Sequence, residues 1–77
     1  MTALDILDTV WQRIGDPSAI VRLERDSQLR TGHYRIVVIS GNIWSAGVAE
    51  PDDWNHPAAL VAAVLDHVAS ERCAKPD

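Results

Sequence analysis

Apolar residues recur at steps of three and four near both ends of the chain, and this spacing predicts two amphipathic helices. The first covers 2–14, where Thr2 and Asp5 have the spacing of a capping box. Its apolar stripe consists of Leu4, Leu7, Val10, Trp11 and Ile14. The second covers 57–72 and begins at Pro57, which suits the first turn of a helix. Its apolar stripe consists of Leu60, Val61, Val64, Leu65 and Val68.

The middle of the chain has the alternation and the β-branched content of a sheet. It predicts strands over 19–25, 33–40 and 43–49. Gly41-Asn42 separates the last two strands and is a signal for a two-residue hairpin turn. The order α-β-β-β-α favours an α+β fold, in which two helices pack on one face of a three-stranded antiparallel meander. We therefore expect a single small domain over residues 1–77.

The hairpin turn determines which side chains share a face of the sheet. If Gly41 and Asn42 form the turn, residue 40 pairs with 43 and residue 39 with 44, and alternate side chains point to opposite faces. One face carries Tyr34, Ile36, Val38, Ser40, Ile43, Ser45, Gly47 and Ala49. The other carries His33, Arg35, Val37, Ile39, Trp44, Ala46, Val48 and Glu50. We assign the first face to the core, because it has no charge and its small residues leave room for a helix.

The second face is more apolar than a surface that only meets solvent. An apolar patch with an aromatic centre and a charged rim is typical of a protein-binding surface. The candidate partner-binding residues are Arg35, Val37, Ile39, Trp44 and Val48. Two alternatives remain open: a helix of the same chain covers this face, or the same face of a second copy does.

The segment between the third strand and the second helix is acidic and contains a tryptophan. Asp52, Asp53 and Trp54 form a candidate second contact, suited to a basic partner. The alternative is that Trp54 packs the start of the second helix against the core.

Size and charge restrict the function classes. The chain has 77 residues, seven of them basic and eleven acidic, for a net charge of −4. This balance disfavours direct nucleic-acid binding, which normally needs a basic excess. Cys73 is the only cysteine, so no internal disulfide can form, and we expect a cytoplasmic protein. No apolar run approaches the length of a membrane span, and the N-terminus has no signal-peptide pattern, so we expect no membrane association.

The candidate chemistry is sparse. His56 and His67 lie about 16 Å apart along the second helix and cannot share a metal ion. The sequence has no G-x-S-x-G, P-loop or dinucleotide-binding motif. We therefore expect no catalytic residues, no metal and no cofactor.

Two resemblances suggest functions. The element order, with Thr31-Gly32-His33-Tyr34, resembles the double-stranded-RNA-binding fold and the HicA-type toxins that cleave mRNA. That resemblance implies an RNA-binding or RNA-cleaving module, with His33 and an arginine set as its site. The arginines are Arg22, Arg25, Arg30 and Arg35. The chain departs from this family in its acidic residues before the last helix.

In size, charge and lack of a catalytic motif, the chain is similar to phage-encoded anti-CRISPR inhibitors. This similarity implies a non-enzymatic inhibitor that occupies the DNA-binding or partner-binding surface of a host defence complex. The expected partner is a larger protein or a nucleoprotein complex in the host cytoplasm. A homodimeric structural or assembly protein is a further alternative.

Overall fold

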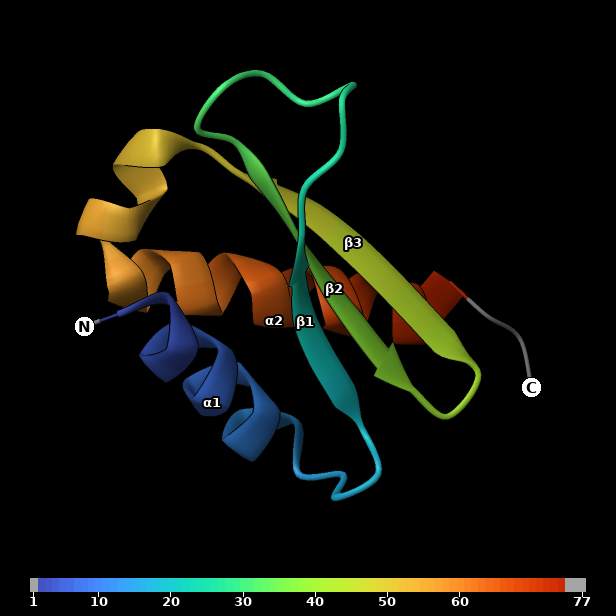
Figure 1. Ribbon diagram of the computed structural model, residues 1–77. Helices are drawn as coiled ribbons and strands as arrows, with labels where there is room; N and C mark the ends of the chain where they lie inside the picture. Colours follow the sequence, from blue (N-terminus) through green and yellow to red (C-terminus); the bar gives the residue numbers. More distant parts are fainter. Residues whose placement is uncertain (1, 75–77) are drawn as a thin grey trace.

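The computed structural model describes residues 2–74 and confirms the predicted α-β-β-β-α order (Figure 1). Its elements are α1 (Ala3–Ile14), β1 (Ile20–Glu24), β2 (Tyr34–Ser40), β3 (Ile43–Ala49), the 3-10 helix η1 (Pro51–Asn55) and α2 (Pro57–Ala74). Each predicted helix and strand appears within two residues of its expected bounds. The short helix η1 was expected only as a loop.

Helix α1 begins with the predicted capping box. The Thr2 hydroxyl accepts a hydrogen bond from the Asp5 backbone N–H at 3.2 Å, and the Asp5 carboxylate accepts one from the Thr2 N–H at 2.9 Å. These bonds satisfy backbone groups that a helix start otherwise leaves free. The helix ends at Gly15, whose φ of 75° is the left-handed conformation that glycine adopts without strain.

The strands form one antiparallel sheet in the order β1-β2-β3, with the predicted hairpin register. Ser40 lies opposite Ile43, and Ile39 lies opposite Trp44. Gly41 has a φ of 61°, the left-handed backbone that a tight two-residue turn requires. Helix α2 passes behind the sheet in Figure 1 and α1 lies beside β1, and buried side chains of both helices pack with the inner-face residues Ile36 and Val38. Within residues 2–74 the fold therefore has two layers, with the other face of the sheet open.

The core lies between the helices and the predicted inner face of the sheet. Its buried residues are Ile6, Val10, Ile36, Val38, Ala49, Leu60, Val61, Val64 and Val68. Residues from β2 alternate strictly here, since Ile36 and Val38 belong to this cluster and Val37 does not. The assignment of the two faces from sequence is therefore confirmed.

Helix η1 forms because its start is capped in the same way as that of α1. The Asp53 carboxylate accepts a hydrogen bond from the Glu50 backbone N–H at 2.8 Å, and Pro51 occupies the first turn. Trp54 then packs against the core and meets the Tyr34 ring edge-on, with the ring centroids 6.4 Å apart. Trp54 thus holds the start of α2 to the sheet, which was the alternative interpretation of this residue.

The loop between α1 and β1 is fastened to the far end of β2 by Asp16. Its carboxylate accepts hydrogen bonds from the Ser18 and Ser40 hydroxyls, both at 2.8 Å. The Ser18 bond, followed by the Ser40 bond, holds the pKa of Asp16 below its ordinary value. The ionised form is therefore the one that the fold stabilises.

This pKa shift predicts that acid weakens the fold. A carboxylate with a lowered folded-state pKa contributes stability that is complete above its unfolded pKa, near 3.8. That contribution is lost as the pH falls through the folded-state value. We expect the urea midpoint to fall below about pH 4, and to fall less in Asp16→Asn than in the original chain. Equal acid dependence in both proteins would contradict this role for Asp16. Asp8→Asn is the control, because Asp8 makes no such contact.

Candidate functional site

The open face of the sheet is built from cross-strand rows of side chains. The register aligns Ile20, Ile39 and Trp44 in one row, Arg22, Val37 and Ala46 in the next, and Glu24, Arg35 and Val48 in the third. We call these residues the outer face. The contribution of β1 was missed from sequence, where only the hairpin was divided into faces. The alternation of Ile20, Arg22 and Glu24 with the inward Val21 and Leu23 was the signal available.

Three apolar side chains of the outer face are open to solvent. Trp44 is 53% exposed, Val48 52% and Ile20 49%, values far above those of the core. The buried residues of both helices pack with the inner-face residues Ile36 and Val38, and Trp44 points to the opposite face, where half of its side chain is exposed. The alternative in which a helix of the same chain covers this face is therefore excluded for residues 2–74.

One predicted contact residue is corrected. Val37 points to the outer face but is 0% exposed. It occupies the middle of the central strand, between Arg22 on β1 and Ala46 on β3, so strands flank it on both sides. Val37 therefore supports the outer face from below and cannot touch a partner, whereas Ile39 remains half-buried and partly accessible.

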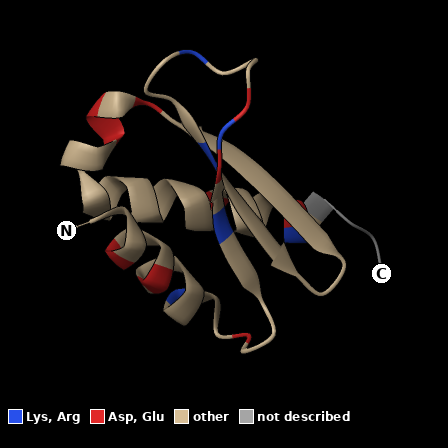
Figure 2. Ribbon diagram, in the orientation of Figure 1, with Lys and Arg blue, Asp and Glu red and all other residues tan. Residues whose placement is uncertain are grey.

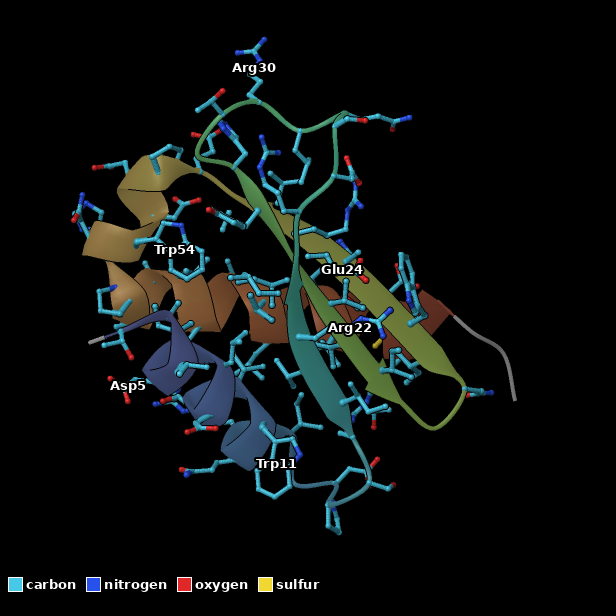
Figure 3. All side chains as sticks on the ribbon, viewed as in Figure 1. Asp5, Trp11, Arg22, Glu24, Arg30 and Trp54 are labelled. Carbon is cyan, nitrogen blue, oxygen red and sulfur yellow. The ribbon has the colours of Figure 1, made fainter. Side chains whose placement is uncertain are left out.

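The charges of the outer face pair with one another. Arg22 Nε lies 3.0 Å from Glu24 Oε2, and the two side chains lie next to each other on the open side of β1 (Figure 3). Arg35 Nη1 lies 2.7 Å from Asp26 Oδ2. This guanidinium is the largest cause of the lowered pKa of Asp26. The apolar row is therefore bordered by neutral ion pairs and not by a field of one sign.

His33 and Glu50, which the hairpin register assigned to the outer face as partners of one another, lie beyond the sheet. The ladder ends at the pair Tyr34 and Ala49, so residues 33 and 50 are not cross-strand partners. The His33 ring lies 3.3 Å from the Thr31 carbonyl oxygen, a local loop contact.

The predicted second contact is separate from the outer face. Asp52, Asp53 and Trp54 lie on η1, at the opposite end of the sheet from the hairpin turn next to Trp44 (Figure 1). Asp53 caps η1 and Trp54 packs on Tyr34, so both have structural roles. Asp52 alone of the three is exposed, and it lies 3.5 Å from His56 Nε2. Acidic residues also gather on η1 and α1 in Figure 2, away from the outer face.

A groove lies between β3 and α2, on the inner side of the sheet. Its volume is about 460 Å³, and its walls include Gly47, Ala59 and Ala63. At one end, the Ser45 hydroxyl lies 2.7 Å from His67 Nδ1, a pair that is 22 residues apart in sequence and was not predicted. A Ser-His catalytic site needs a third group, usually a carboxylate, that orients the histidine. Among the described residues no carboxylate is bonded to His67. The pair instead fastens α2 to β3.

Within residues 2–74 no group of three or more His, Cys, Asp and Glu side chains comes together to hold a metal ion. In the same part of the chain, no helix is long and apolar enough to cross a bilayer. Comparison of the chain with protein-family models, curated proteins and solved structures finds no match.

Proposed function

We propose that this chain is a non-enzymatic protein-binding inhibitor that docks onto a larger protein through its outer face. The observation that carries the proposal is the exposure of Trp44, which lies opposite Ile39 on the same face as the exposed Ile20 and Val48, a face that nothing in residues 2–74 covers. Tryptophan is among the residues most enriched at binding hot spots. Leaving it exposed in solvent has a cost that burial against a partner removes.

The arrangement of charge indicates the chemistry of the partner. The apolar row supplies the centre of the contact, and the ion pairs around it supply a polar rim. Since Arg22 and Arg35 are already neutralised by Glu24 and Asp26, the face suits an apolar protein surface with a mixed polar border. It is poorly suited to a strongly charged one.

The same pairing weakens the RNA-binding alternative. Of the arginines proposed for RNA, Arg22 and Arg35 form ion pairs, and Arg25 donates to the backbone carbonyl oxygens of Asp26 and Leu29. Arginines engaged in this way must give up a partner before they can bind phosphate.

Replacement of Trp44 by alanine tests the proposal. We expect Trp44→Ala to weaken partner binding by at least about tenfold, because the indole supplies the largest apolar contact of the outer face. The free energy of unfolding should change by less than about 1.5 kcal/mol, well below the loss for a core residue, since half of the ring is already exposed. Leu4→Ala, which removes an exposed apolar side chain from α1, is the control.

The measurement is quantitative capture of proteins from host lysate by the original chain and by both variants. The proposal requires a protein that the original chain and Leu4→Ala capture equally and that Trp44→Ala loses. If every captured protein persists with Trp44→Ala, or if that variant is strongly destabilised, the outer face is not the docking site.

The resemblance to anti-CRISPR inhibitors makes the proposed function more specific. In that form, expression of the chain restores phage growth on a host whose CRISPR system targets that phage, and expression of Trp44→Ala does not. If neither the original chain nor Trp44→Ala restores phage growth, the chain does not inhibit the CRISPR system tested. The capture experiment then still decides whether the outer face binds a protein.

A further inference from the structure

Among residues 2–74, the free edge of β3 lacks the features that usually keep an edge strand from pairing. The sheet order leaves β3 at one edge, and its seven residues, IWSAGVA, include no charge and no proline. Natural edge strands are commonly protected by charged side chains, proline, bulges or a covering element. A long apolar edge without them is a template for a further strand.

The opposite edge of the sheet is protected. Strand β1 has only five residues and carries Arg22 and Glu24. Helix α1 lies beside it, and Trp11 Nε1 donates a hydrogen bond to the Ala19 carbonyl oxygen just before the strand, at 3.1 Å. The contrast assigns any strand pairing to β3.

The hairpin geometry identifies the backbone groups that face outward. In a two-residue hairpin the residues flanking the turn, here Ser40 and Ile43, form a hydrogen-bonded pair. Such pairs recur at every second residue, so residues 45, 47 and 49 also face β2. The amide and carbonyl groups of Trp44, Ala46 and Val48 therefore point toward the free edge.

We propose that two copies of this chain pair through the β3 edge, antiparallel about a two-fold axis at Ala46. This register places Ala46 opposite itself and Trp44 opposite Val48 of the second copy. Aromatic and β-branched side chains form favourable cross-strand pairs. The three strands of each copy then join in one six-stranded sheet.

The inner side of the sheet fits the same register. Ile43 of the second copy lies opposite Ala49, so its side chain faces the groove of about 460 Å³ between β3 and α2. The groove is bordered by small side chains, including Ala59 and Ala63, which leave space for an isoleucine. Ser45 and Gly47 face each other across the axis, where small residues are needed.

Charge favours this orientation. Each chain carries a net charge of −4, and Glu50, Asp52 and Asp53 follow directly after β3. A parallel arrangement would bring these acidic groups together. The antiparallel one places them beside the uncharged turn, Gly41 and Asn42, of the second copy, so repulsion between the chains is smallest.

The pairing does not depend on the proposed function. It uses the edge of β3 and leaves the outer faces of the two copies side by side on one side of the sheet. Failure of one proposal therefore leaves the other standing.

A disulfide placed on the proposed axis tests the pairing. Ala46→Cys in a Cys73→Ser background puts two thiols on residues whose Cα atoms would lie about 5.5 Å apart, within the disulfide range. Val48→Cys in the same background is the control, because its two copies would lie about 13 Å apart along the strands. We expect Ala46→Cys to cross-link at least about fivefold faster under mild oxidation.

Charge at the axis gives a second test with intact folding. Ala46→Lys and Ala46→Glu each place like charges opposite one another, so each alone should dimerise more weakly than the original chain. Their equimolar mixture should recover the dimer, measured by sedimentation equilibrium. A monomeric original chain up to about 1 mM, or equal cross-linking of the two cysteine variants, overturns the proposal.

Discussion

Truncation of Ile36 to alanine is expected to remove a large part of the stability of this domain. Ile36 is 2% exposed and sits on the central strand, within the cluster that both helices contact. Removing a buried isoleucine side chain costs about 2–5 kcal/mol, because the lost burial is joined by an unfilled cavity. For a 77-residue chain, whose whole stability is of order 4–12 kcal/mol, this is a large fraction.

The measurement is urea unfolding followed by circular dichroism, with Ile20→Ala as the matched control. Ile20 is the same residue type on a neighbouring strand, but it points to the outer face and is 49% exposed. We expect about 3 kcal/mol for Ile36→Ala and less than about 1 kcal/mol for Ile20→Ala. Similar losses in the two variants would mean that the two faces of the sheet are assigned wrongly.

Replacement of Trp54 by alanine is expected to destabilise the fold by about 2–3 kcal/mol, less than for a fully buried tryptophan. Trp54 is half-buried, packs against the core and meets Tyr34 with an interplanar angle of 78°, an edge-to-face contact. In Figure 3 the indole lies between η1 and the start of α2, so its loss leaves that junction without its main apolar contact.

Trp54→Phe is the control for this prediction, because it keeps an aromatic ring against Tyr34 and should recover at least half of the loss. The comparison with Trp44→Ala separates the two tryptophans by role: one variant loses stability and the other loses binding. If Trp54→Ala is stable but fails to bind the partner, Trp54 belongs to the docking surface and is not mainly a structural residue.

The fold was accessible from sequence because its local signals agree. The capping box at Thr2, the turn at Gly41-Asn42 and the alternation along β2 each specify one geometry, and the observed helices and register follow from them. A two-residue turn fixes the register of both strands, and with it the face of every hairpin side chain. The exposure of Trp44 follows from this register together with the placement of both helices on the other face.

The candidate site could be predicted only in part, because several of its features depend on residues that are distant in sequence. The burial of Val37 depends on neighbours from two other strands, which the alternation of its own strand does not reveal. The contact between Ser45 and His67 joins a strand and a helix, and no local sequence pattern predicts it. Helix η1 was missed because prolines and acids are common in loops, although Glu50 and Asp53 have capping-box spacing.

The two ends of the sheet are attached to the rest of the molecule by different forces. Near Tyr34 the attachment is a pair of aromatic rings, which protons do not affect. Near the hairpin it is a pair of serine hydroxyls, Ser40 bonded to the Asp16 carboxylate and Ser45 bonded to the His67 ring. Protonation of Asp16 removes the anchor at the hairpin end, and protonation of Asp26 removes its ion pair with Arg35 next to Tyr34, so acid should loosen both ends of β2 while the aromatic contact persists.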